Sequence, residues 1–290
     1  MTTSVAAQPN TSSPLTVRRI SGALGAELRG LRVADLDDAG FDALRAALIE
    51  HKVIFLPEQH VTPDEHRAFG SRFGEMELHP YLPKLDEEHP EIVVLRSGNG
   101  FIADVWHTDV TFVDSPPKFS VLNMLEPSPY GGDTMWTNQA LAYASLSAPM
   151  REMLLGLTAV HTARKFGDPS QQAEHPVVRR HPETGEPSLF VNRQFTERIT
   201  ALSRGESDAL LSYLYSFSEQ PHFTCRYSWS PGAIGIWDNR ITQHYVVNDF
   251  EGDRTISRVT ITGDDPQPAG DTSRWNPYAV RRMSAAGHEG

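Results

Sequence analysis

The sequence predicts a mainly β protein, a double-sheet jelly roll with helices packed on its outside. Two observations carry this prediction. Strand candidates lie far apart along the chain between clusters of Pro, Gly and Asn or Asp, and few segments have apolar residues at helical spacing. The chain has 290 residues, of which 39% are hydrophobic and 22% charged. It can therefore bury a sizeable core, and we expect a single domain over residues 15–264.

The expected elements begin with a strand at 15–20, a turn at Gly22 and Gly25, and a helix over 41–50. Residues 51–57 form a short apolar run that ends in proline, which is typical of a buried strand. A helix should begin at Thr62, with Pro63 in its first turn, and end near Gly74. Further strand candidates are 92–95, 119–125, 189–191, 223–229, 233–237 and 256–262, and further helices are 139–144 with 148–157, and 203–218.

Composition limits the partners and the compartment. The formal net charge of -11, with Lys and Arg scattered, argues against nucleic acid and anionic lipid as partners. No window approaches the ~20 apolar residues of a membrane helix, and no signal-peptide pattern is present, so we expect a cytoplasmic protein. Residues 1–14 and the tail 265–290 are rich in small residues and Pro, which predicts disorder. The single cysteine, Cys225, is expected to be a small apolar filler, which leaves any metal site to His and carboxylate ligands.

A candidate metal site combines two distant segments. In WHTDVTF (106–112), His107 and Asp109 are two residues apart, and on a strand this spacing points both side chains to one face. A third ligand, His244, follows an apolar strand that runs into a polar turn, in WDNRITQH (237–244). Two His and one carboxylate form a facial triad, which leaves open positions on Fe(II) for a chelating cosubstrate and O₂. The alternative for a His-x-Asp pair is a surface turn or a supporting hydrogen bond.

Two arginines follow the third candidate ligand. Arg254 and Arg258 are four residues apart, so a strand would carry both guanidinium groups on one face. On an outer face they would simply be solvated. If they face inward, they need anions to offset desolvation, and planar guanidinium groups suit carboxylates and sulfonates.

At these residues the sequence resembles the taurine dioxygenase (TauD/TfdA) family of Fe(II)- and 2-oxoglutarate-dependent dioxygenases, which includes alkylsulfatases and herbicide-degrading enzymes. The resemblance covers residues 17–264. Its blocks are WHTDVTF (106–112), GGDTMW (131–136), HPVV (175–178), LFVN (189–192), WDNRITQHY (237–245) and RVTITGD (258–264). The fold it implies is a double-stranded β-helix, a cupin-like jelly roll with flanking helices.

The resemblance also implies residue roles. His107, Asp109 and His244 correspond to the Fe(II) ligands, and Arg254 with Thr134 to the pair that binds the distal carboxylate of 2-oxoglutarate. For the primary substrate, the corresponding residues are His79 and Arg258 on the sulfonate and Phe195 as an aromatic wall.

Three positions depart from the taurine enzymes. Leu82 stands in place of a pocket tyrosine, Ala103 in place of an asparagine, and Ala163 in place of a phenylalanine. These changes remove polar and aromatic contacts around a small amine. We therefore expect a substrate that is bulkier or more apolar than taurine.

The implied reaction is hydroxylation of a small anionic substrate, a sulfonate such as taurine or a bulkier alkylsulfonate, with release of sulfite, succinate and CO₂. Alternatives within the family are an alkyl-sulfate ester, an aryloxyalkanoate or a secondary-metabolite acid. Two other classes stay open: a zinc hydrolase with the same ligands, and a non-catalytic jelly-roll binding protein. The resemblance also implies a dimer or tetramer.

Overall fold

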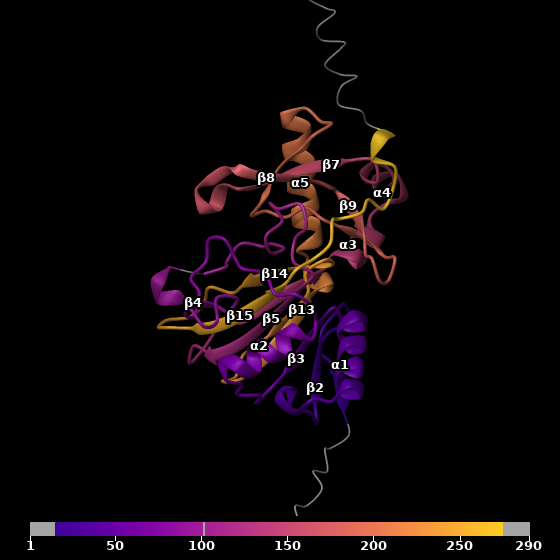
Figure 1. Ribbon diagram of the computed structural model, residues 1–290. Coiled ribbons are helices and arrows are strands. Elements are labelled where there is room, and N and C mark those ends of the chain that lie inside the picture. The colour runs from indigo at the N-terminus through magenta and orange to yellow at the C-terminus, as the bar shows by residue number, and fades with distance from the viewer. Residues whose placement is uncertain (1–14, 101, 275–290) are drawn as a thin grey trace, which may run out of the picture.

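The structure is a computed structural model that describes residues 15–100 and 102–274 (Figure 1). Its strands are β1 (Thr16–Arg19), β2 (Ala26–Arg29), β3 (Val53–Leu56), β4 (Val93–Arg96), β5 (Phe119–Glu126), β6 (Thr134–Asn138), β7 (Thr158–Ala163), β8 (Asp168–Pro176), β9 (Val178–Arg180), β10 (Pro187–Leu189), β11 (Thr196–Ile199), β12 (Thr224–Tyr227), β13 (Ile234–Asp238), β14 (Thr242–Val246) and β15 (Thr255–Ile261). Its α-helices are α1 (Asp38–His51), α2 (Pro63–Ser71), α3 (Gln139–Ser145), α4 (Ala148–Leu154) and α5 (Arg204–Ser218). The predicted class, mainly β with outer helices, is confirmed.

Two sheets build the jelly roll. The larger has the strand order β1-β2-β3-β13-β5-β15-β4, so strands from both ends of the chain alternate in it. The smaller has the order β12-β6-β14. Apolar side chains of both sheets meet in one core cluster, in which the Phe55 ring of β3 stacks on the Tyr227 ring of β12 with centroids 3.8 Å apart. Cys225 lies in this cluster and is buried, as expected of an apolar filler.

Helices α1 and α2 cover the outer face of the large sheet at its N-terminal end (Figure 1). Leu44 and Leu48 of α1 and Phe69 of α2 are buried against Ile54 and Val259 of that sheet. Helix α2 begins as predicted, with a capping box in which Thr62 and Glu65 satisfy each other's backbone N–H groups. The remaining helices, α3, α4 and α5, pack with β7, β9, β10 and β11 in a second apolar cluster, in the upper part of Figure 1.

Several strands lie outside the predicted ranges: β2, β6, β7, β8, β9, β11 and β14. The polar turn expected before His244 is present at residues 239–241, and the unpredicted strand β14 follows it. It pairs with β6 in an antiparallel register that sets His244 opposite Trp136. Four of the five residues of β14 are buried, so both faces of the strand are covered. The strand therefore lacks the alternation of apolar and polar residues that could have predicted it.

The first part of the expected disordered tail is ordered. The Arg180 N–H donates to the Gln267 carbonyl at 2.7 Å, and the Ala269 N–H donates to the Val178 carbonyl at 3.0 Å. These backbone hydrogen bonds fix a Pro- and Gly-rich segment that composition alone assigned to disorder. Residues 1–14 and 275–290, for which disorder was also predicted, lie outside the described residues.

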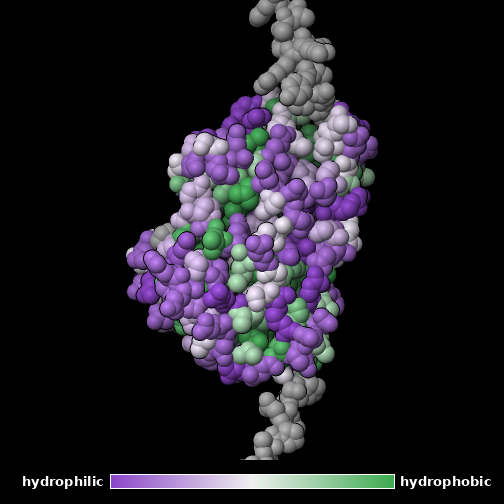
Figure 2. All heavy atoms as spheres, viewed as in Figure 1, coloured by the Kyte–Doolittle hydropathy of each residue, from purple (hydrophilic) through white to green (hydrophobic). Residues whose placement is uncertain are grey.

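The surface facing the viewer in Figure 2 is mostly hydrophilic, with small separate groups of hydrophobic residues. Among the described residues, no helix has the length and apolar character needed to cross a bilayer.

Candidate functional site

The two histidines of the predicted triad are neighbours through their backbones. The His107 N–H donates to the His244 carbonyl at 3.1 Å, and the His244 N–H donates back to the His107 carbonyl at 2.8 Å. This isolated bridge joins the segment before β5 to the middle of β14. It holds the imidazoles with centroids 4.0 Å apart, although the residues are distant in sequence.

Asp109 also lies at this site, but its local backbone structure differs from the prediction. It lies in a turn instead of a strand, and Val110 directly after it has a left-handed backbone with φ 54°. The side chain of Asn239 fixes this turn: its Oδ1 accepts from the Asp109 N–H at 2.8 Å, and its Nδ2 donates to the Asp109 carbonyl at 3.1 Å. The Ser120 hydroxyl donates to Asp109 Oδ2 at 2.9 Å. The two-residue strand spacing was therefore wrong as an explanation, but the two side chains do converge.

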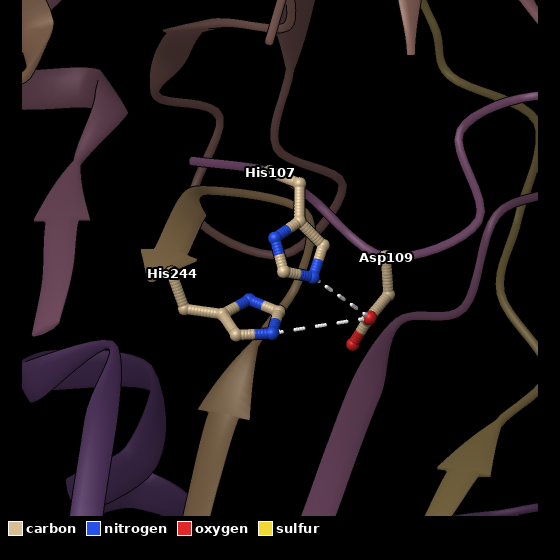
Figure 3. Close-up of side chains that lie close together, drawn as sticks. All are labelled: His107, Asp109 and His244. Atoms are coloured by element: carbon tan, nitrogen blue, oxygen red, sulfur yellow. Dashed lines mark ion pairs between the residues drawn. The ribbon is translucent and has the colours of Figure 1, made fainter. Parts of the chain in front are cut away.

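The three side chains point toward one another (Figure 3). Asp109 Oδ1 lies 3.6 Å from His107 Nε2 and 3.9 Å from His244 Nε2, and one ligand atom from each residue lies within 4.8 Å of the others. Hydrogen bonds are shorter than these separations. Two atoms that each bind one ion at about 2.1 Å can be at most about 4.2 Å apart, so both separations leave room for an ion between the ligands.

The protonation states suit a metal. His107 Nδ1 lies 2.8 Å from the Val105 carbonyl, so this nitrogen carries the proton and Nε2 presents its lone pair to the cluster. Burial, together with the neighbouring His107, lowers the pKa of His244 well below its usual range, which keeps the imidazole neutral. Burial would raise the pKa of Asp109, but Arg258 and the two histidines lower it well below its usual range. A neutral His244 imidazole, an ionised Asp109 and the His107 Nε2 lone pair are thus brought together in a buried pocket.

Arg254 and Thr134 line a second cavity of about 40 Å³ beside His244, which we call the inner cavity; Arg258 also lines it. Arg254 Nη2 lies 3.4 Å from Thr134 Oγ1, and Arg254 Nε donates to the Gly132 carbonyl at 3.1 Å. Gly132 has φ +67°, and a Cβ there would lie 3.3 Å from Arg254 Cδ, which accounts for glycine at this position.

Arg254 is buried, and no carboxylate of the described residues lies within ion-pair distance of it. Desolvation lowers its pKa to about 10, and the nearby Asp133 opposes that change. Buried cations are normally paired. The inner cavity is therefore suited to an external anion.

His79, Phe195 and Arg258 line a larger cavity of about 110 Å³ together with His107 and Asp109, which we call the outer cavity. Arg258 Nη1 donates to Asp109 Oδ1 at 2.8 Å, so the guanidinium is already engaged by a candidate metal ligand, while its Nε has no partner among the described residues. His79 Nδ1 accepts from the N–H groups of residues 81 and 82, both at 3.2 Å. Its proton is therefore on Nε2, a neutral donor.

Two of the three departures from the taurine enzymes face the outer cavity. Leu82 and Ala103 line it. Ala163 instead lies fully buried in an apolar cluster with Val110 and Phe195. Ala163 is not among the residues that line the outer cavity, so the expectation that it directly enlarges the pocket was wrong.

The sequence analysis missed several residues of the site. Asn239 and Ser120 fix Asp109, and the Trp229 indole N–H donates to Thr134 Oγ1 at 2.9 Å. Lys165 and Gln194 also line the outer cavity. The only signal for Asn239 was its place in the WDNRITQHY block, which does not show that it contacts Asp109. Lys165 and Gln194 lie on connecting segments without a sequence pattern.

The sheets and the buried cluster define a jelly-roll protein with a two-histidine, one-carboxylate candidate metal centre. The model of the family described as taurine catabolism dioxygenase TauD, TfdA family matches residues 16–260. The chain belongs to this family.

Individual relatives agree. An alpha-ketoglutarate-dependent sulfate ester dioxygenase from Pseudomonas putida is 37% identical over 87% of this chain and 91% of its own length. An alpha-ketoglutarate-dependent sulfonate dioxygenase from Saccharomyces cerevisiae is 31% identical over 87% of this chain and 68% of its own length. The crystal structure of a taurine dioxygenase from Burkholderia xenovorans, 39% identical, superposes with a TM-score of 0.80 over 89% of this chain and 94% of the other. The predicted cupin-like jelly roll is thereby confirmed.

Proposed function

We propose that this chain is an Fe(II)- and 2-oxoglutarate-dependent dioxygenase that hydroxylates a small organosulfur anion, releasing succinate and CO₂ and, from a sulfonate, sulfite. The observation that carries the proposal is the buried cluster of His107, Asp109 and His244, with the unpaired Arg254 in the adjoining inner cavity. Membership in a dioxygenase family favours this function over a zinc hydrolase or a non-catalytic binding protein.

The donor set fits Fe(II). Two imidazoles and a carboxylate are the facial arrangement of non-haem Fe(II) oxygenases, which leaves positions for other ligands. His107, Asp109 and His244 would hold the ion, and Asn239 and Ser120 would keep the carboxylate turned toward it. When bound, Fe(II) supplies the coupled activation of O₂ and 2-oxoglutarate that oxidises an unactivated carbon.

Arg254 and Thr134 would bind the distal carboxylate of 2-oxoglutarate. The guanidinium donates, the threonine hydroxyl adds a further donor, and the Trp229 indole N–H holds Thr134 Oγ1 in position. The inner cavity also reaches His244, so a dicarboxylate bound to Arg254 can extend toward the candidate metal ligands. The chain's contribution here is orientation and exclusion of water.

The substrate anion would bind in the outer cavity, between Arg258 and His79. Arg258 keeps unused N–H groups beyond the one on Asp109, and His79 offers its Nε2–H. Burial and the adjacent Arg258 lower the pKa of His79 to about 4, so it donates as a neutral imidazole at neutral pH. Phe195 would pack against the substrate's carbon chain beside His107.

A sulfonate is the leading substrate class and an alkyl-sulfate ester the second. Relatives of this chain are named for each class, a sulfate ester dioxygenase at 37% identity and a sulfonate dioxygenase at 31%. An aryloxyalkanoate or a secondary-metabolite acid fits the same cavity chemistry. The test is a panel of sulfonates, sulfate esters and carboxylates, with Fe(II), O₂ and 2-oxoglutarate. We expect succinate release to be stimulated by one anion class, and sulfite to appear in equal amount if that class is the sulfonates. Turnover that needs zinc and no 2-oxoglutarate would refute the proposal.

A further inference from the structure

The lining of the outer cavity includes polar side chains of two kinds, buried and more exposed, together with apolar residues. Its buried end holds Arg258, His79 and the candidate metal ligands. Among the described residues that line it, Lys165 and Gln194 supply the other polar side chains. Much of the remaining lining is apolar and includes Leu82, Ile102, Ala103 and Phe195.

Lys165 and Gln194 lie at the open side of this cavity. Lys165 is exposed and Gln194 half-buried, whereas Arg258 is 6% exposed. Lys165 belongs to the short 3-10 helix η3 (Arg164–Phe166), which follows β7. Its ammonium donates to Gln194 Oε1 at 2.7 Å, so the two side chains from separate segments are held together at the mouth.

The charge of Lys165 is not neutralised by an ion pair among the described residues. Burial lowers the pKa of Lys165, and the nearby Asp104 opposes that change; Asp104 Oδ2 itself accepts from Asn248 Nδ2 at 3.0 Å. The ammonium therefore presents a positive charge and two further N–H donors toward the cavity entrance.

We propose that Lys165, with Gln194, forms a subsite for the distal end of the substrate and selects tails that carry a hydrogen-bond acceptor or a negative charge over tails that carry an amine. The proposal rests on the proposed function, because Arg258 and His79 fix the other end of the same molecule. Lys165 is thus a specificity-determining residue. It disfavours taurine, whose ammonium would face a like charge where Leu82 and Ala103 offer no acceptor.

The test compares substrates that differ only in the charge of the tail. Each compound of the first series has a sulfonate at one end, a chain of two to four carbons, and an ammonium, a hydroxyl or a carboxylate at the other end. A second series has a sulfate ester in place of the sulfonate. The measurement is kcat/KM for succinate release coupled to substrate. For the wild type we expect carboxylate and hydroxyl tails to exceed the ammonium tail of equal length by about 5-fold or more.

Variants separate the subsite from a general charge effect. Lys165→Glu should reverse the order of the tails, and Lys165→Arg should preserve it. Arg164→Glu makes the same charge change on the preceding residue, which is exposed and ion-paired with Glu197 instead of lining the cavity, and should leave the order unchanged. An unchanged order in Lys165→Glu would overturn the subsite while leaving the proposed function intact. No stimulation by any member of either series would contradict the proposed function, and the subsite with it.

Discussion

Arg254 carries a buried positive charge for which the described residues offer hydrogen-bond acceptors but no carboxylate. Folding this arrangement costs desolvation energy that only a bound anion recovers. The side chain therefore supports the proposal that the inner cavity binds an anion, independently of any sequence comparison.

Arg254→Ala should raise the KM for 2-oxoglutarate about 100-fold or more, because loss of a buried charge-assisted contact costs about 3 kcal/mol. Initial rates of succinate formation at varied 2-oxoglutarate measure this directly. Arg204→Ala removes an exposed arginine of α5 that pairs with Asp208, and it should leave the KM unchanged. Equal KM values in Arg254→Ala and the wild type would rule out Arg254 as the cosubstrate residue.

Asn239 contacts both backbone polar groups of Asp109 and also donates to the Pro117 carbonyl at 2.9 Å. These hydrogen bonds hold the carboxylate-bearing turn, including the left-handed Val110, in the conformation that faces the histidines. Asn239 is thus a positioning residue for a candidate ligand.

Asn239→Ala should weaken Fe(II) binding by about 10- to 100-fold, as is typical when a residue that orients a metal ligand is removed. Anaerobic metal titration gives the dissociation constant, and excess Fe(II) should restore much of kcat. Asn248→Ala, at an exposed asparagine bonded to Asp104, serves as the control. If Asn239→Ala lowers only thermal stability and leaves the dissociation constant unchanged, the role of Asn239 is structural.

At the scale of the element, helix α2 is joined to the large sheet through a buried histidine. His66 Nε2 donates to the Val121 carbonyl of β5 at 3.0 Å, and its Nδ1 lies 3.3 Å from the Ser257 hydroxyl of β15. In the neutral imidazole, one ring nitrogen donates to the carbonyl and the other can accept from the hydroxyl. Burial lowers the pKa of His66 to about 4, against the opposing effect of the bond to Val121.

The free energy of unfolding should fall as the pH drops below about 6.5, the usual pKa of histidine in an unfolded chain. The unfolded state then binds a proton that the folded state excludes until about pH 4, so His66 alone can remove up to about 3 kcal/mol. Urea unfolding at several pH values should show a smaller acid loss in His66→Gln than in the wild type. His222→Gln, at an exposed histidine, should keep the full loss. Identical pH dependence in all three proteins would contradict this assignment.

The elements that sequence predicted best are those with a clear local signal. The helical spacing of apolar residues predicted α1, a helix over 203–218 was predicted where α5 lies, and Thr62 followed by Pro63 predicted the start of α2. Strands β7 and β8 were missed because β8 is largely exposed and polar and β7 has no apolar run. Strand β14 was missed for the opposite reason, since its burial on both faces leaves no alternation.

At the scale of the whole molecule, the order of the sequence blocks predicted the fold and the candidate site, but the spatial arrangement came from long-range pairing. The bridge between His107 and His244 depends on how β14 joins the small sheet, which no local pattern encodes. The same holds for Lys165 and Gln194, which reach the outer cavity from separate connecting segments. The sequence blocks predict the candidate ligands, whereas the topology determines which other side chains surround them.

The most direct test of the account is an anaerobic titration of the purified chain with Fe(II), followed by 2-oxoglutarate, in the wild type and in His107→Ala, Asp109→Ala and His244→Ala. We expect the wild type to bind one equivalent of Fe(II), and 2-oxoglutarate to bind tightly only once the metal is present. Each variant should lose both. If His244→Ala binds Fe(II) with wild-type affinity and still forms succinate, the metal centre assigned here is contradicted.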